Sequence, residues 1–265
     1  MNGKQLIILG ILIVVLSVVG KFLWSAMSKV KVDDFHPAAV IFLVDSSASN
    51  QNALAEQKKT LKQICNLLDP EDQIKILRVS EDAYLIYEGT PFNNSGISKA
   101  LDAFTSYDSK DYGTAYGVAM KKGFNHALTM KKEGYVPGIV ILGDLENEGA
   151  IEKQINWDLL PKNVESSKEY MPDLAMMFLY AHPEKLDMVK EKLTPVLGEQ
   201  KLIVSPEQNT DKALRQFIHA LGRWFIWVKR VVSIQTKYKK MWGKFNDNSY
   251  SIFKIGKSIW WKRSD

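Results

Sequence analysis

Hydrophobic and polar positions divide this chain into regions of different character. Residues 6–24 are almost continuously apolar and contain one charged residue, Lys21. Residues 25–37 form a short polar stretch, and residues 38–222 alternate between strand-like and helix-like patterns. Residues 223–265 are rich in basic and aromatic residues. The pattern predicts a flank at 1–5, an apolar helix at 6–24, a linker at 25–37, one domain at 38–222 and a tail.

The domain has the pattern of a sheet covered on both faces by helices. Continuous apolar runs such as Ala38–Val44 and Gly138–Leu142 are typical of buried parallel strands. Gln73–Val79 and Ala83–Tyr87 predict a hairpin, which supplies one antiparallel edge strand. The other expected elements are helices at Asn52–Leu68, Ser98–Phe104, Ala115–Met130, Pro183–Leu197 and Asp211–Leu221, a loop and helix over Trp157–Tyr170, and strands at Asp173–Tyr180 and Leu202–Val204. This order predicts an α/β fold with a doubly wound, mostly parallel sheet.

The apolar segment at 6–24 is long enough to cross a membrane. As a helix it would extend roughly 28 Å at about 1.5 Å per residue. A cleaved signal peptide is the alternative, with Lys4 before the apolar run and Ala26-Met27-Ser28 as a cleavage site. The bulky residues Phe22, Leu23 and Trp24 before that site favour an uncleaved, single-pass anchor. The sequence leaves open on which side of the membrane the domain lies.

The positive charge of the chain is concentrated in its tail. Residues 223–265 hold 11 Lys/Arg and 2 Asp/Glu, a net +9, so the remaining 24 Lys/Arg and 28 Asp/Glu give −4. This distribution disfavours a nucleic-acid-binding domain. The tail composition suits an interface with anionic lipid, while stacking on single-stranded nucleic acid or docking on an acidic protein are alternatives. The membrane-interface residues are expected to be Trp224, Trp227, Lys229, Arg230, Trp242, Trp260 and Trp261.

Cysteine and histidine exclude some classes of site. Cys65 is the single cysteine, so no internal disulfide can form. With one Cys and four scattered His, a structural zinc site is disfavoured. Cys65 lies on the apolar face of a predicted helix, and we expect it to be a small core residue.

Side chains with oxygen atoms occur in three predicted loops at one edge of the sheet. Asp45, Ser47 and Ser49 come directly after the first strand, Thr114 precedes a long helix, and Asp144 follows the strand at Gly138–Leu142. Ligands of open α/β sheets lie beyond the carboxyl ends of the strands. Such oxygens suit Mg²⁺, with Mn²⁺ or Ca²⁺ as alternatives. The alternative without metal is that the hydroxyls cap helices and turns.

This set of residues resembles the metal-ion-dependent adhesion site of von Willebrand factor type A domains. That site consists of D-x-S-x-S, a distant Thr and a distant Asp, in this order. The resemblance extends from about Ala38 to Leu221. It implies that Ser47, Ser49 and Thr114 bind the cation directly or nearly so. Asp45 and Asp144 would then act through water.

The chain departs from the family pattern beside the last aspartate. The family often has Thr or Ser before this Asp and Gly after it, whereas this chain has Gly143 and Leu145. The departure puts the shape of that loop in question, but not the carboxylate.

The resemblance predicts a binding protein rather than an enzyme. The cation would retain positive charge and one open position, which the Asp or Glu of a protein partner would fill. The function expected is therefore a membrane-tethered, Mg²⁺-dependent protein-binding module. One alternative is a metal-free scaffold subunit of a membrane assembly. Another is a Mg²⁺-dependent hydrolase with Asp45 as nucleophile, which is disfavoured because no Lys or His stands beside the motif.

Overall fold

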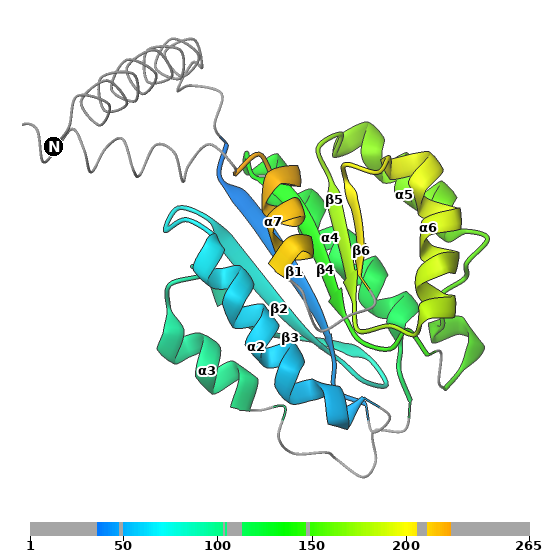
Figure 1. Cartoon of the computed structure of the whole chain (residues 1–265), viewed down its shortest axis with the longest axis horizontal. Helices are drawn as coiled ribbons and strands as arrows, with labels where there is room; N and C mark the ends of the chain where they lie inside the picture. Colours follow the sequence, from blue (N-terminus) through cyan, green and yellow to red (C-terminus); the bar gives the residue numbers. More distant parts are fainter. Residues whose placement is uncertain are drawn as a thin grey trace, which may run out of the picture. The chain divides into compact units, whose positions relative to one another are not determined.

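The computed structural model describes residues 36–47, 50–102, 104, 113–146, 149–205 and 211–223. Within these ranges a six-stranded sheet has the order β3-β2-β1-β4-β5-β6 (Figure 1). β3 is antiparallel to β2, and every other neighbouring pair is parallel. The strands are β1 (Ala38–Asp45), β2 (Gln73–Val79), β3 (Ala83–Gly89), β4 (Val136–Leu142), β5 (Ala175–Leu179) and β6 (Leu202–Ser205). The predicted α/β sheet with one antiparallel edge strand is confirmed.

Helices cover both faces of this sheet. The helices are α2 (Gln51–Leu67), α3 (Asn94–Asp102), α4 (Tyr116–Lys132), α5 (Leu160–Tyr170), α6 (Pro183–Leu197) and α7 (Asp211–Ala220), with a short 3-10 helix η3 (Ile151–Lys153). Apolar residues of α2, α3 and α7 pack together on one face, and those of α4, α5 and α6 pack on the other. The fold is therefore doubly wound, as the alternation of strands and helices predicts.

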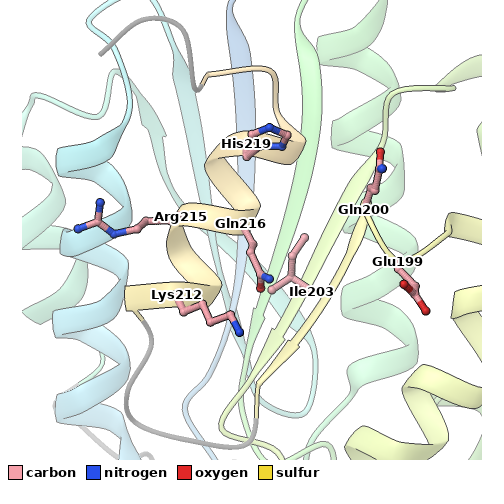
Figure 2. A pocket seen from close by; sticks show the side chains of 7 residues that line it. All are labelled: Glu199, Gln200, Ile203, Lys212, Arg215, Gln216 and His219. Carbon is pink, nitrogen blue, oxygen red and sulfur yellow. The ribbon is translucent and has the colours of Figure 1, made fainter. Parts of the chain in front are cut away.

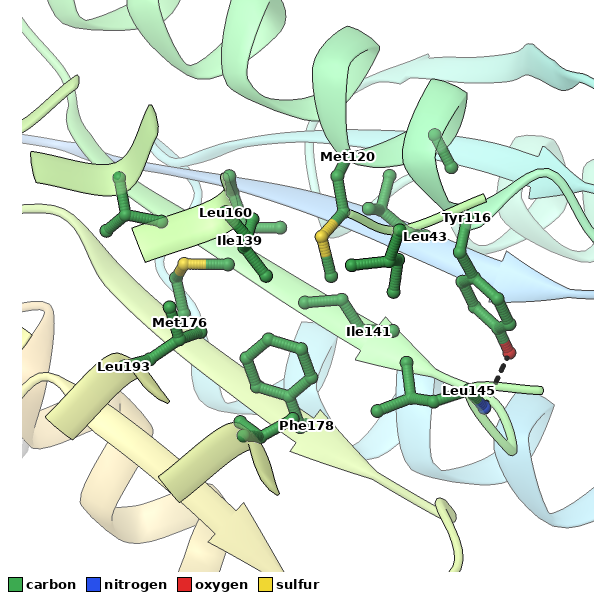
Figure 3. Close-up of a cluster of buried hydrophobic side chains, with 14 of the residues drawn as sticks. Leu43, Tyr116, Met120, Ile139, Ile141, Leu145, Leu160, Met176, Phe178 and Leu193 are labelled. Carbon is green, nitrogen blue, oxygen red and sulfur yellow. Dashed lines mark hydrogen bonds between the residues drawn. The ribbon is translucent and has the colours of Figure 1, made fainter. Parts of the chain in front are cut away.

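The central strand β1 shows why its residues form a continuous apolar run. Val40 and Phe42 pack with α2 and α7, whereas Ile41 and Leu43 pack with α4 (Figure 3). Side chains alternate between the two faces of a strand, so a strand covered on both faces needs apolar residues at every position. All eight residues of β1 are buried.

The helix α3 is the element whose predicted position differs most from the structure. The apolar spacing predicts a start at Ser98, but the helix begins at Asn94. The side-chain Oδ1 of Asn93 accepts a hydrogen bond from the backbone N–H of Gly96 at 3.0 Å, which satisfies a donor of the first turn. That turn is polar, so its hydrophobic pattern carries no signal.

Both ends of the domain are tied to one buried carboxylate. Asp72 lies just before β2, and its Oδ1 accepts a hydrogen bond of 2.7 Å from the backbone N–H of Ala38, where β1 begins. The same carboxylate forms a buried ion pair with Arg223, beyond the end of α7. The start of β1 and the end of α7 therefore lie together, at the edge of the sheet opposite the carboxyl end of β1.

Some predictions concern residues outside the described ranges. The apolar segment at 6–24 lies there, as do Ser49 and the tail residues from Trp224 onward. Among the residues that the structure describes, no helix is long and apolar enough to cross a membrane. The prediction for Cys65 is confirmed, because this residue of α2 is buried in the core.

Candidate metal centre

The structure brings the predicted oxygen ligands that it describes to one edge of the sheet. Asp45 is the last residue of β1, and Asp144 follows the end of the neighbouring strand β4. The segment that carries Thr114 is held beside β2, because the backbone N–H of Ala115 donates to the carbonyl oxygen of Ser80 at 2.7 Å. β2 pairs with β1 on the side away from β4, so the three segments converge around the carboxyl end of β1.

Asp45 is fully buried, and the chain determines the orientation of its carboxylate. Oδ1 accepts a hydrogen bond from the backbone N–H of Ser47 at 2.8 Å, and Oδ2 accepts one from the hydroxyl of Tyr116 at 2.7 Å. Burial raises the pKa of Asp45 to about 7, the hydrogen bonds from Ser47 and Tyr116 oppose the shift, and the charge of Asp144 adds to it. Asp45 and Asp144 are therefore close enough to repel each other, and a cation between them would relieve this repulsion.

Asp144 sits in a tight turn that its own side chain closes. Its Oδ1 accepts a hydrogen bond from the backbone N–H of Glu146 at 2.9 Å. Leu145 has a φ of 60°, a left-handed conformation in which a residue with a Cβ is strained by about 1–2 kcal/mol. The Leu145 side chain is fully buried in the core, and full burial of a leucine contributes about 1.5–3 kcal/mol. Burial therefore explains how leucine occupies a position where the family often has glycine.

Thr114 supplies the observation that bears most directly on a ligand. Its side chain is completely buried, and its Oγ1 has no hydrogen-bond partner among the described residues. Leaving a buried hydroxyl without a partner costs about 1–3 kcal/mol, so most such groups in proteins are satisfied. A cation at this edge would satisfy Thr114, and the nearby Ser47 is also buried. The residues present therefore fit a hard cation.

The two carboxylates alone do not make a metal site. In the described ranges, no group of three or more His, Cys, Asp or Glu side chains is placed to hold a metal ion. Any cation here must therefore also use hydroxyl oxygens, as a site with Ser47 and Thr114 would.

Comparisons with known proteins agree with this fold. The family model of the von Willebrand factor type A domain matches residues 40–147. These residues run from β1 to just beyond Asp144 and include the whole predicted ligand set. The match covers less than half of the chain, and it shows that this part of the chain is similar to a von Willebrand factor type A domain.

Solved structures with this fold are similar in shape and distant in sequence. A von Willebrand factor type A protein from Catenulispora acidiphila has 14% identity and a TM-score of 0.50, with 71% of this chain and 43% of that chain covered. The pilus adhesin SpaC from Lactobacillus rhamnosus GG has 12% identity, a TM-score of 0.50, and coverages of 70% and 29%. The SpRpn10 VWA domain has 12% identity, a TM-score of 0.51, and coverages of 68% and 95%. The first two structures are thus much longer than the region they share with this chain. The comparison with curated proteins found no match.

The sequence analysis missed two residues of this candidate metal centre. Tyr116, the first residue of α4, directs its hydroxyl to Asp45 and also accepts a hydrogen bond of 3.3 Å from the backbone N–H of Leu145 (Figure 3). A Cβ atom at Gly143 would lie 2.0 Å from this hydroxyl oxygen. The glycine at 143, already recognised as a departure from the family pattern, was the available signal. The sequence analysis assigned no role to Tyr116.

A separate cleft lies beside β6, the strand at one edge of the sheet. It has a volume of about 660 Å³ and runs between α7 and the edge strand β6. Lys212 and Gln216 extend from α7 toward Ile203 of β6, whereas Arg215 points toward α2 (Figure 2). None of the predicted metal ligands lines this cleft, so it is distinct from the candidate metal centre.

Proposed function

We propose that this protein is a membrane-tethered binding module that uses a divalent cation, preferably Mg²⁺, to hold a carboxylate of a protein partner. Ser47, Ser49 and Thr114 would bind the cation through their hydroxyl oxygens. Asp45 and Asp144 would hold it through water. When bound, the cation supplies a positive charge with an open coordination position for the Asp or Glu of the partner.

The observation that carries this proposal is the buried, unpartnered hydroxyl of Thr114. It lies at an edge where Asp45, Ser47 and Asp144 also converge. Each of these groups alone has an ordinary structural explanation, such as a cap or a turn. Together they form a set of oxygen atoms that Mg²⁺ prefers, with at least one hydroxyl left for a ligand.

The ligand chemistry favours capture of an anion. Hydroxyl ligands are neutral and leave the charge of the cation uncompensated. The Asp45 carboxylate is enclosed and already accepts hydrogen bonds from Ser47 and Tyr116. If both carboxylates act through water, a carboxylate from the partner becomes the charged ligand that binds the cation directly.

The same contacts favour binding over catalysis. A nucleophilic aspartate must reach the atom that it attacks. Asp45 is completely buried, and both of its carboxylate oxygens are engaged by Ser47 and Tyr116. This arrangement suits a residue that orients the water of a cation, and it opposes the hydrolase alternative.

Tethering to a membrane rests on the sequence outside the described domain. The apolar segment at 6–24 is long enough to span a bilayer, and the basic, aromatic tail suits an anionic surface. The shared position of Ala38 and Arg223 at one edge supports this proposal, because both attachments would then leave the domain on the side away from the cation.

Calorimetric titration of the full chain in detergent with Mg²⁺ and Mn²⁺ tests the metal site. The parent is compared with a Ser47→Ala, Ser49→Ala variant. A matched control is Ser166→Ala, Ser167→Ala, which removes two hydroxyls from α5 away from the centre. We expect saturable binding in the parent and the control, and none in the first variant.

A second titration in the presence of acetate tests the role of the partner's carboxylate. Acetate should increase the affinity of the parent for Mg²⁺, because it can occupy the open position. If the parent binds neither cation, with or without acetate, the metal-dependent function is wrong and the metal-free scaffold replaces it.

A further inference from the structure

From these contacts we infer that Tyr116 is a positioning residue of the cation site. Its hydroxyl orients the Asp45 carboxylate for the water of the cation and links Asp45 to the loop of Asp144. Gly143 is the residue that makes room for this hydroxyl. The inference rests on the proposed cation binding and assigns to that site two residues outside the D-x-S-x-S, Thr and Asp set.

The direction of the two hydrogen bonds follows from the groups involved. The backbone N–H of Leu145 can only donate, so the Tyr116 hydroxyl accepts this bond of 3.3 Å through a lone pair. The single hydroxyl proton is then available for Oδ2 of Asp45, at 2.7 Å. The hydroxyl thus joins the end of β1 to the loop after β4.

These bonds fix the rotation of the Asp45 carboxylate. Oδ1 is held by the backbone N–H of Ser47 and Oδ2 by Tyr116. An ionised carboxylate has about four acceptor positions, so it can still receive a hydrogen bond from water on a cation beside those from Tyr116 and from the backbone and side chain of Ser47. Groups that orient the ligands of a metal typically change its affinity by about 10–100-fold when they are removed.

Gly143 and Tyr116 depend on each other. β1 and β4 pair in parallel with Val44 opposite Leu142, which places Gly143 beside Asp45. A Cβ atom at 143 would lie 2.0 Å from the Tyr116 hydroxyl oxygen and 2.6 Å from Cβ of Asp45. No side chain fits there while the tyrosine is in place. A residue with a side chain at 143 therefore requires the tyrosine hydroxyl to leave Asp45.

The test compares two tyrosine hydroxyls in the full chain purified in detergent. Tyr116→Phe removes the hydroxyl at Asp45. Tyr180→Phe is the matched control, because its partly buried hydroxyl bonds to Thr60 at 2.5 Å and to the carbonyl oxygen of Glu56 at 3.3 Å. Two quantities are measured for each protein: the Mg²⁺ dissociation constant by calorimetry, and the thermal midpoint in EDTA.

We expect both variants to lose thermal stability in EDTA, while only Tyr116→Phe weakens Mg²⁺ binding, by about 10–100-fold. A purely structural role would lower stability without this selective loss of affinity. A spectroscopic signature accompanies it. Mg²⁺ should perturb the near-ultraviolet tyrosine absorption of the parent and of Tyr180→Phe, because the phenol bonds to the carboxylate that holds the water of the cation, and this change should be absent in Tyr116→Phe.

The outcomes separate this inference from the proposed function. If the parent binds Mg²⁺ and Tyr116→Phe binds it within about threefold of the parent, Tyr116 is only a core residue and the inference is wrong. If the parent binds neither Mg²⁺ nor Mn²⁺, even with acetate, the proposed function fails and the inference fails with it. If Tyr116→Phe does not fold, the parent spectrum decides, because saturation with Mg²⁺ without any tyrosine signal overturns the inference.

Discussion

Replacing Thr114 by valine should stabilise the metal-free domain and abolish its response to Mg²⁺. Valine has nearly the shape of threonine, so the change exchanges a hydroxyl for a methyl group with little change in packing. In the structure this hydroxyl is buried, and no described residue forms a hydrogen bond with it. In most buried sites Thr→Val breaks a hydrogen bond and is destabilising. Here the sign is expected to be the opposite.

The magnitude follows from the cost of an unsatisfied buried hydroxyl. Removing it should relieve about 1–3 kcal/mol in the metal-free state. For a domain of this size each kcal/mol raises the thermal midpoint by about 2–4 °C. With Mg²⁺ at 100 times its dissociation constant, the parent should gain about 2.7 kcal/mol, whereas the variant should gain nothing. The variant should therefore be more stable than the parent in EDTA, and saturating Mg²⁺ should remove most of this advantage or reverse it.

Thermal unfolding followed by circular dichroism, in EDTA and in Mg²⁺, measures both effects. Thr114→Ser is the control, since it keeps the hydroxyl and should keep the response to Mg²⁺. Two results would refute the reasoning. The first is a Thr114→Val variant that is less stable than the parent in EDTA, which would mean that the hydroxyl is bonded in the metal-free protein. The second is a variant whose Mg²⁺ response equals that of the parent.

Three further predictions concern the fold. Burial raises the pKa of the Cys65 thiol to about 12. A thiol reagent at pH 8 should therefore label the protein in urea but not in the folded state. Rapid labelling of the folded protein would contradict this burial. Gly138→Ala should lower the free energy of unfolding in urea by about 1–3 kcal/mol, because the new Cβ would lie 2.8 Å from Cζ of Phe217. An unchanged urea midpoint would show that α7 moves aside without cost. Arg223→Met should cost about 3 kcal/mol by the same assay, because it leaves Asp72 buried without its cation, and Asp72→Asn in the same chain should recover part of the loss.

The local pattern of the sequence was sufficient to predict most of the fold. The run Ala38–Val44 is apolar at every position because β1 is covered on both faces, and a pattern of this kind is visible without tertiary information. The hairpin of β2 and β3 was also predicted, and only the length of β3 changed. The start of α3 was predicted four residues too late, because Asn93 stabilises a polar first turn that has no hydrophobic signature.

The sequence also named the candidate ligands, and their binding of a cation stays a prediction. Asp45, Thr114 and Asp144 could be assigned to one edge because the carboxyl ends of parallel strands meet at the same side of a sheet. Asp45 and Asp144 follow apolar runs, and Thr114 precedes a long helix; these positions were enough for this step. Direct binding of a cation by Ser49 and its neighbours stays a prediction, since Ser49 lies outside the described residues.

The sequence by itself therefore determined the order of the strands and helices along the chain, the edge at which the candidate oxygen ligands gather, and the concentration of positive charge in the tail. Only the tertiary structure decided how these ligands are held. The contact between Tyr116 and Asp45 joins residues 71 positions apart, and the space at Gly143 has meaning only once that tyrosine is in place. The pairing of Asp72 with Arg223 is of the same kind. Periodicity reports which face of an element is buried, whereas a hydrogen bond between distant elements depends on distances of a few ångströms that packing alone sets.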